Sequence, residues 1–138
     1  MPTLTRVVHA AVLLDFDGHQ ILTDPWFSQK PGYYHGEPLA FTPTRLPRLA
    51  AVVASHRHYD HYDLAAFAAY PDKAVPMVVN RGMGGQARDA GFTDVREVEV
   101  WQQVHRAILR TRRAGRRAGV PLPRQVWRLA VGLGRTGV

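Results

Sequence analysis

Short apolar runs separated by turn residues fill the first part of the chain. Residues 6–16 are mostly apolar and partly β-branched, and residues 19–24 repeat this pattern. The dipeptide Asp17-Gly18 between them is typical of tight hairpin turns. We therefore predict a first strand over 6–16 and a returning strand over 19–24. Pro25 then ends the pair, because proline cannot continue a central ladder.

Apolar runs and helical patterns alternate over the next fifty residues. The predicted elements are a buried strand over 49–54, a helix over 63–70, a strand over 74–80, a helix over 86–90 and a half-exposed strand over 95–100. Asp63 stands near the start of the first helix, and Gly91 follows the second as a C-cap. This rhythm of strand and helix is that of an α/β layer.

The length and composition narrow the class of protein. The chain has 138 residues, enough for one small domain with a hydrophobic core. It contains no cysteine, which excludes a disulfide framework and a thiolate metal site. No apolar run approaches the length of a membrane span, and the N-terminus lacks the charged-then-apolar pattern of a signal peptide. We therefore expect a cytoplasmic protein without a transmembrane segment.

Charge is distributed unevenly along the chain, whose formal net charge is +7. Residues 1–105 carry 9 Lys/Arg against 11 Asp/Glu, a net charge of −2, whereas residues 106–138 carry 9 Arg and no acid. We call residues 106–138 the Arg-rich tail. Because the tail has no sustained apolar period, we predict a folded domain over 1–105 and a disordered or irregular tail that is not part of the fold.

Three histidines and one aspartate lie within six positions between the predicted strand 49–54 and the predicted helix 63–70. We call this stretch, Ser-His-Arg-His-Tyr-Asp-His over residues 55–61, the histidine loop. Its candidate metal ligands are His56, His58, Asp60 and His61. If the loop starts extended, the first two histidines point the same way, and a chain that curls toward the helix brings the other two side chains to the same point. Imidazoles and a carboxylate are ligands that Zn²⁺, Mn²⁺ and Fe²⁺ accept. The alternative is a histidine-rich surface loop, in which these groups would repel or stay unsatisfied unless hydrogen bonds collected them.

The spacing H-x-H-x-D-H in this strand–turn–helix context resembles the signature of the metallo-β-lactamase superfamily. The resemblance extends to about residue 103, and it is to the branch that includes ascorbate-6-phosphate lactonase and the N-acylphosphatidylethanolamine-cleaving phospholipase D. It implies an α/β fold, namely the N-terminal half of an αββα sandwich with a mixed sheet and flanking helices. It also implies a metal-dependent hydrolase with a two-metal site, in which activated water attacks a phosphodiester, lactone or ester. Zn²⁺ is the expected metal, with Mn²⁺ or Fe²⁺ as alternatives, and Asp60 would be catalytic by orienting the water.

Two further segments match that branch. His9 stands in the first predicted strand, and Thr23-Asp24-Pro25-Trp26 ends the second. The resemblance implies that Asp24 supports the metal site by holding a ligand histidine; the alternative is a carboxylate in a strand-end turn. For His9, a half-buried strand histidine and a metal ligand both remain open.

Residues 28–48 form a long irregular segment that contains proline and glycine. Such a segment in a small domain is usually functional or mobile. In the resembled family this region borders the active-site groove, which places Tyr33, Tyr34 and His35 nearest to the substrate. An ordinary surface loop is the alternative for each of them.

The ligand set that the resemblance implies is incomplete in this sequence. The first two histidines of the histidine loop would serve one metal and Asp60 with His61 the other, while a third ligand for each and a bridging aspartate should come from later segments. No aspartate follows Asp94, and His105 is the only later histidine. We therefore expect a family member truncated or frameshifted after about residue 104. It should show little or no turnover by itself unless a second chain completes the sheet.

A competing interpretation treats the Arg-rich tail as a basic arm that binds a polyanion. Trp127 is the only aromatic residue in the tail, so stacking on single strands is poorly supported and no specific nucleic acid is expected as a partner. The sequence thus predicts a metal-dependent hydrolase of a small-molecule substrate. The alternative is a non-catalytic protein that binds metal or a polyanion.

Overall fold

The structure is a computed structural model that describes residues 1–107 and 126–130. These residues fall into two compact units, Met1–Glu99 and a second unit that begins at Val100. Each unit is described by itself.

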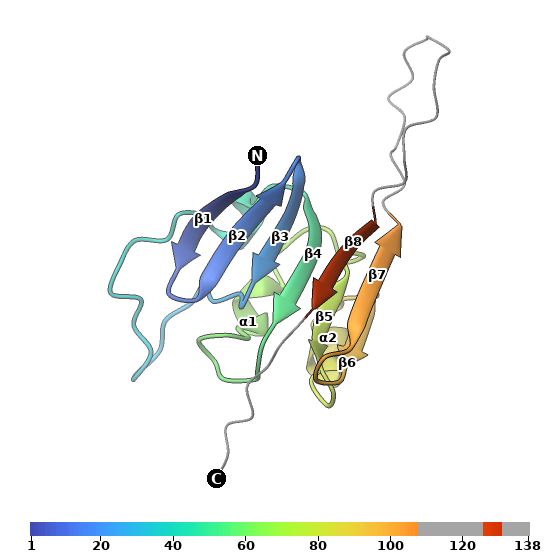
Figure 1. The fold of residues 1–138 in the computed structure, drawn as a ribbon. Coiled ribbons are helices and arrows are strands. Elements are labelled where there is room, and N and C mark those ends of the chain that lie inside the picture. The colour runs from blue at the N-terminus through green and yellow to red at the C-terminus, as the bar shows by residue number, and fades with distance from the viewer. Residues whose placement is uncertain (108–125, 131–138) are drawn as a thin grey trace. The chain divides into compact units, whose positions relative to one another are not determined.

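The first unit is built on one mixed sheet of six strands in chain order (Figure 1). The strands are β1 (Thr3–Val8), β2 (Ala11–Phe16), β3 (His19–Thr23), β4 (Leu49–Ala54), β5 (Met77–Asn80) and β6 (Val95–Val98). The β1–β2 and β2–β3 pairs are antiparallel, and β3 to β6 run parallel. The predicted α/β class with a mixed sheet is confirmed.

The connections agree with the predicted turn and cap residues. The β2–β3 hairpin turns at Asp17 and Gly18, both of which have positive φ as such tight turns require. A short 3₁₀ helix, η1 (Pro43–Arg45), interrupts the long segment before β4. The helix α1 (Leu64–Phe67) is capped by the Asp63 side chain, and α2 (Gly84–Asp89) is followed by Gly91 with φ of 91°.

The prediction of one strand over residues 6–16 is wrong. A tight turn at His9 and Ala10 divides this stretch into β1 and β2, with Val8 paired to Ala11 and a φ of 49° at His9. No glycine, proline, asparagine or aspartate marks this turn, so the apolar pattern alone does not show it. His9 therefore lies at an end of the sheet and not within a strand.

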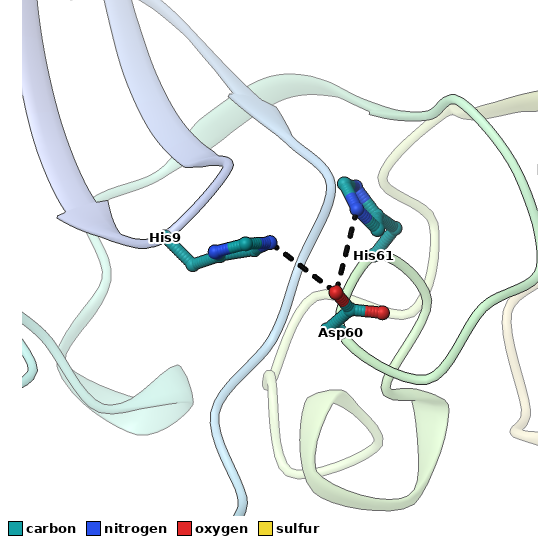
Figure 2. A group of neighbouring side chains, drawn as sticks. All are labelled: His9, Asp60 and His61. Atoms are coloured by element: carbon teal, nitrogen blue, oxygen red, sulfur yellow. Dashed lines mark ion pairs between the residues drawn. The ribbon is translucent and has the colours of Figure 1, made fainter. Parts of the chain in front are cut away.

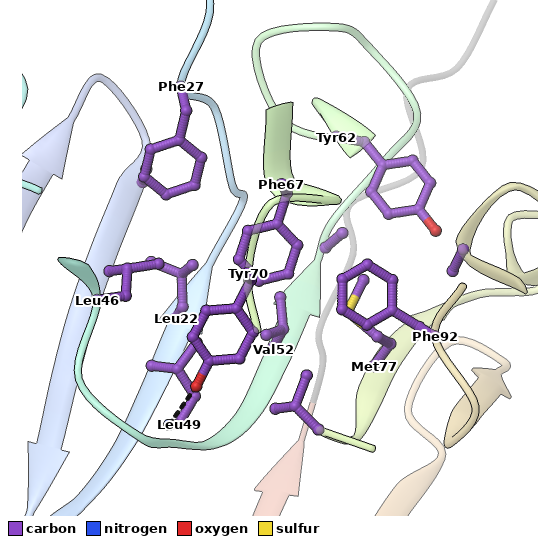
Figure 3. Close-up of a cluster of buried hydrophobic side chains, with 14 of the residues drawn as sticks. Leu22, Phe27, Leu46, Leu49, Val52, Tyr62, Phe67, Tyr70, Met77 and Phe92 are labelled. Atoms are coloured by element: carbon purple, nitrogen blue, oxygen red, sulfur yellow. Dashed lines mark hydrogen bonds between the residues drawn. The ribbon is translucent and has the colours of Figure 1, made fainter. Parts of the chain in front are cut away.

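The hydrophobic core lies between one face of the sheet and the two helices (Figures 1 and 3). The strand register aligns one buried row across the sheet: Leu13, Leu22, Val52 and Met77. Phe67 stacks on Tyr70 and on Phe92, each with ring centroids 5.4 Å apart. The Tyr70 hydroxyl accepts a 2.9 Å hydrogen bond from the Leu49 amide, which satisfies a buried donor at the start of β4 (Figure 3).

The topology brings distant segments to one edge of this sheet. The two antiparallel pairings make β1 run in the same direction as β3, and β4 and β5 share that direction. The residues that follow these strands, including His9, Asp24 and the histidine loop, therefore emerge at the same edge. In open α/β sheets, the carboxyl ends of parallel strands are where ligands bind.

The second unit contains an antiparallel pair formed by β7 (Gln103–Ala107) and β8 (Val126–Ala130). The sequence analysis does not predict this pair, and β8 lies in the Arg-rich tail. Residues 108–125 and 131–138 lie outside the described residues, so the prediction for most of the tail and the domain boundary at residue 105 stay predictions. Within the described residues, no helix has the length and apolar character needed to cross a membrane.

Candidate metal centre

Hydrogen bonds from two neighbouring strand ends fix the histidine loop. The Ser55 amide donates to Asp24 Oδ1 over 2.6 Å, and Asn80 Nδ2 donates to the Ser55 carbonyl over 2.6 Å. The His61 and Tyr62 amides both donate to the His58 carbonyl, over 3.0 and 2.9 Å. These bonds curl the chain after β4, which is the bend that brings the candidate ligands round to one side.

His56 and His58 approach each other through their ring nitrogens. His56 Nε2 lies 3.1 Å from His58 Nδ1, and the other ring nitrogen of His56 lies 2.9 Å from the Ser55 hydroxyl. Burial lowers the pKa of His56 below its ordinary value of 6.5, and the neighbouring imidazoles of His61 and His58 lower it further. The neutral imidazole, which is the form that binds metal, is therefore favoured.

Asp60 lies between two imidazoles (Figure 2). Its Oδ2 is 3.6 Å from His61 Nε2 and 3.2 Å from His9 Nε2. The donor atoms of His9, Asp60 and His61 all lie within 4.8 Å of one another. His61 also links this group to the first pair of histidines, since its ring centroid is 4.1 Å from that of His56.

Asp24 lies on the opposite side of the His61 ring. Its Oδ2 is 3.3 Å from His61 Nδ1, an atom that is buried and makes no hydrogen bond among the described residues. Carboxylates commonly face the far nitrogen of a metal-binding histidine in this way, fixing the ring and its tautomer. The role of Asp24 in holding a ligand histidine stays a prediction, and this geometry supports it.

The donor set suits a divalent transition metal. His9, Asp60 and His61 form one cluster of donor atoms, and the neighbouring pair of His56 and His58 contacts it through the His61 ring. Together these side chains offer imidazole nitrogens and carboxylate oxygens without sulfur. This chemistry fits Zn²⁺, Mn²⁺ or Fe²⁺. The residues of this chain therefore fit the metal that the sequence predicts, although the donor types do not select one ion.

The long segment after β3 contributes residues of different kinds. Tyr33 lines a pocket of about 640 Å³ beside His58. Tyr34 is 68% exposed, and His35 packs against Trp26 with ring centroids 4.4 Å apart. Of these predicted residues near the substrate, only Tyr33 therefore lines the described pocket.

Two cations that the sequence analysis does not single out also line this pocket, Lys30 and Arg57. The Lys30 ammonium lies 3.7 Å from the centroid of the Tyr59 ring, and Arg57 donates to the Gly82 carbonyl over 3.0 Å. No local motif marks either residue, because the contacts that place them come from segments far apart in the sequence. Asp89 on α2 lines the pocket as well.

We expect the Asp24→Asn variant to bind Zn²⁺ about 10–100-fold more weakly than the wild type. The amide can still accept from the Ser55 amide, but the negative charge facing His61 is lost. Affinity is measured by competition with a chromogenic chelator. Asp15→Asn, in the hairpin at the far end of β2, is the matched control, and equal loss in both variants would contradict the role of Asp24.

Comparisons with known proteins agree with this architecture. A profile for the family described as "Beta-lactamase superfamily domain" matches residues 19–122. An uncharacterized protein of Mycobacterium tuberculosis is 35% identical over 105 residues, covering 69% of this chain and 28% of that protein. The mitochondrial N-acyl-phosphatidylethanolamine-hydrolyzing phospholipase D of Saccharomyces cerevisiae is 30% identical over 93 residues, covering 63% of this chain and 20% of that protein.

A solved structure shows the same fold. CmlA, a diiron β-hydroxylase from Streptomyces venezuelae, aligns with a TM-score of 0.55 and 27% identity, covering 75% of this chain and 22% of that one. The chain spans less than a third of the length of each of these three proteins. The resemblance drawn from the H-x-H-x-D-H spacing is confirmed. The chain belongs to the beta-lactamase superfamily, and its six-stranded unit corresponds to the N-terminal half of the metallo-β-lactamase fold.

Proposed function

We propose that the protein is a metal-dependent hydrolase in which water attacks a phosphodiester, lactone or ester. The observation that carries this proposal is the convergence of the histidine loop at the sheet edge, with Asp24 against His61 Nδ1 at 3.3 Å. Side chains so arranged need a cation or hydrogen bonds to collect them, and a cation would bind several of their donor atoms at once. Family membership supports the same reaction class.

Different residues of the histidine loop would bind the metals and orient the water. The imidazoles of His56 and His58 would hold one metal, and the carboxylate of Asp60 and the imidazole of His61 would hold the other. When bound, the metal would supply a Lewis acid that lowers the pKa of a water molecule. Asp60 would also orient that water, because its carboxylate is partly exposed beside the imidazoles. The hydrogen bond from the Ser55 amide to Asp24 fixes the start of the loop that carries Asp60.

The pocket beside His58 favours an anionic substrate. Lys30 and Arg57 bring two positive charges to its walls, and the ring of Tyr59 holds the Lys30 ammonium in place. Asp63 and Asp89 also line this pocket. Asp63 is only 1% exposed and its carboxylate already accepts from the Phe27 and Ser28 amides, whereas Asp89 is exposed. Among the three substrate classes, we therefore propose a phosphodiester first, because its charge would be stabilised by the two cations.

Zn²⁺ is the metal we propose, on the basis of the imidazole-rich donor set. Iron is the specific alternative, because CmlA is a diiron enzyme with 27% identity to this chain. Manganese remains compatible with the same nitrogen and oxygen donors. The cytoplasmic location and a second chain that completes the sheet also remain proposals.

We expect residues 1–138 to hydrolyse a chromogenic phosphodiester at a low rate that depends on added Zn²⁺, Mn²⁺ or Fe²⁺. The rate is expected to be low because the bridging aspartate that the resemblance implies has no counterpart after Asp94. The His58→Ala variant should lose the activity, whereas His19→Ala at the start of β3 should retain it. Hydrolysis that is independent of metal, or equal in the two variants, would contradict the proposal and favour the non-catalytic alternative.

A further inference from the structure

We propose that His9 is a protein ligand of the metal centre and binds the same divalent transition metal as Asp60 and His61. This inference rests on the proposed metal-dependent function and deepens it. It also assigns a role to the turn between β1 and β2, for which the sequence left two interpretations open.

Two of the three distances among these side chains match ligands of a shared metal, and the donor atoms all lie within 4.8 Å of one another. Two ligands that each lie about 2.1 Å from a tetrahedral ion are about 3.4 Å apart. The Oδ2 atom of Asp60 is 3.2 Å from His9 Nε2 and 3.6 Å from His61 Nε2, which brackets this value. In Figure 2 the His9 and His61 rings both face the same oxygen of Asp60, and dashed lines join each ring to it.

The ring of His9 is held in place by its own surroundings. Its backbone adopts φ of 49°, a left-handed conformation that is costly for a residue other than glycine. Its amide donates to Glu37 Oε1 over 2.9 Å, and Arg6 pairs with the same carboxylate oxygen over 2.8 Å. The imidazole packs edge-on to Trp26, with ring centroids 5.3 Å apart. This strained but well-supported turn directs Nε2 toward Asp60.

The ring of His61 is oriented so that its Nε2 atom could bind the same ion. Asp24 lies 3.3 Å from its Nδ1, on the side away from Asp60, which leaves Nε2 to face the carboxylate and His9. Asp24 is itself fixed by the Ser55 amide. The two imidazoles therefore present their Nε2 atoms to one oxygen of Asp60, and each ring is oriented by a separate part of the chain.

The competing role for His9 is a hydrogen bond to Asp60 without metal. The His9 side chain is 45% exposed and that of Asp60 is 25% exposed. An ion pair as open to solvent as this one stabilises a protein by only about 0–1 kcal/mol. The free energy gained from such a pair is smaller than the cost of a left-handed residue, which is on the order of 1–3 kcal/mol. A metal ligand accounts for both the strain and the convergence.

The inference changes the expected ligand count of this chain. The histidine loop alone would supply two protein ligands to each metal, whereas His9, Asp60 and His61 supply three to one ion. Three protein ligands with a fourth position open to water are the usual arrangement of a catalytic zinc site. One metal position would then be complete within the described residues of the first unit.

The test uses Co²⁺ as the probe and a cysteine as the reporter. The natural sequence contains no cysteine, so a His9→Cys substitution introduces the only thiol of the protein. A thiolate bound directly to Co²⁺ gives a near-ultraviolet charge-transfer absorption that nitrogen and oxygen ligands do not give. His19→Cys is the matched control, because His19 lies at the opposite end of β3 from Asp24.

We expect the charge-transfer band in His9→Cys, saturating at one equivalent of Co²⁺, and its absence in His19→Cys. A second variant, His9→Gln, keeps a hydrogen-bond donor for Asp60 but not an imidazole. It should bind Co²⁺ about 100-fold more weakly than the wild type, a loss of about 2.7 kcal/mol, and show an altered visible spectrum.

Two results would overturn the inference. If the wild type binds Co²⁺ and His9→Gln retains both its affinity and its visible spectrum, His9 is only a hydrogen-bond partner of Asp60, and the proposed hydrolase function still stands. The same conclusion follows if His9→Cys binds Co²⁺ without a thiolate band. If the wild type itself binds no Co²⁺, the inference and the proposed metal-dependent function fail together.

Discussion

Replacing Asp60 with alanine should weaken the binding of Zn²⁺ by more than about 100-fold, since even residues that only support a ligand contribute about 10–100-fold. Asp60 Oδ2 lies 3.2 Å from His9 Nε2 and 3.6 Å from His61 Nε2, so the substitution removes a carboxylate that contacts both rings. Loss of the carboxylate also leaves neighbouring imidazoles without a negative charge between them. The affinity is measured by chelator competition at neutral pH.

The control for this substitution is Asp72→Ala. Asp72 lies after α1, where its carboxylate accepts a 3.0 Å hydrogen bond from the Ala74 amide, and it makes no described contact with the histidine loop. We expect Asp72→Ala to bind Zn²⁺ as the wild type does. If Asp60→Ala retained wild-type affinity while remaining folded, the metal would have to bind elsewhere, and the site assignment would be wrong.

Replacing Asp63 with alanine should lower the free energy of unfolding by about 3–5 kcal/mol. Asp63 is only 1% exposed, and its Oδ2 accepts from the Phe27 amide, the Ser28 amide and the Ser28 hydroxyl over 3.1, 2.8 and 2.7 Å. Its Oδ1 caps α1 by accepting from the Ala66 amide. The variant leaves these donors unpaired, which is a large loss against a typical total of about 5–15 kcal/mol.

Urea unfolding measures this effect, with Asp89→Ala as the control. Asp89 is an exposed residue on α2, and its replacement should change the free energy of unfolding by no more than about 0.5 kcal/mol. Because Ser28 also contacts the Tyr59 hydroxyl, Asp63→Ala should disturb the pocket wall as well as the fold. Equal free energies of unfolding of the two variants would show that the hydrogen bonds of Asp63 do not stabilise the contact between α1 and the segment after β3.

Local patterns were sufficient to predict most of the sheet. The strand predicted over 49–54 coincides with β4. A short, uninterrupted apolar run that is partly β-branched, between a loop and the histidine loop, is typical of a buried strand. The Asp17-Gly18 turn is equally local, since its two positive φ angles are typical of these residues. The histidine loop was found by its spacing, which depends only on one strand-to-helix turn.

Contacts between distant segments account for what the sequence did not show. His9 meets Asp60 only because β1 runs in the same direction as β3 and β4, and the turn that makes this possible carries no turn residue. Asp63 was predicted near the start of a helix, but its bonds to Phe27 and Ser28 cross 35 or more residues. The β8 strand was missed for a similar reason, as its partner β7 lies far before it in the chain.

The strand topology also explains why the candidate metal ligands and the residues that support them lie at one edge of the sheet. Asp24 follows β3, the histidine loop follows β4 and Asn80 ends β5, so the hydrogen bonds of Ser55 join three neighbouring strand ends. The core beneath them is closed by the stacked rings of Phe67, Tyr70 and Phe92 (Figure 3). A rigid scaffold with functional groups on its connecting loops is the arrangement that positions ligands well.

The central claim, that the histidine loop is a metal centre, is tested most directly by anomalous X-ray scattering from crystals grown with Zn²⁺. Data collected on either side of the zinc absorption edge locate the ion without assumptions about its ligands. We predict that the strongest anomalous difference peak lies in contact with Asp60 and His61, at the sheet edge where Asp24 follows β3. A map with no peak at this edge, or with zinc only on His19 or another surface group, would contradict the account.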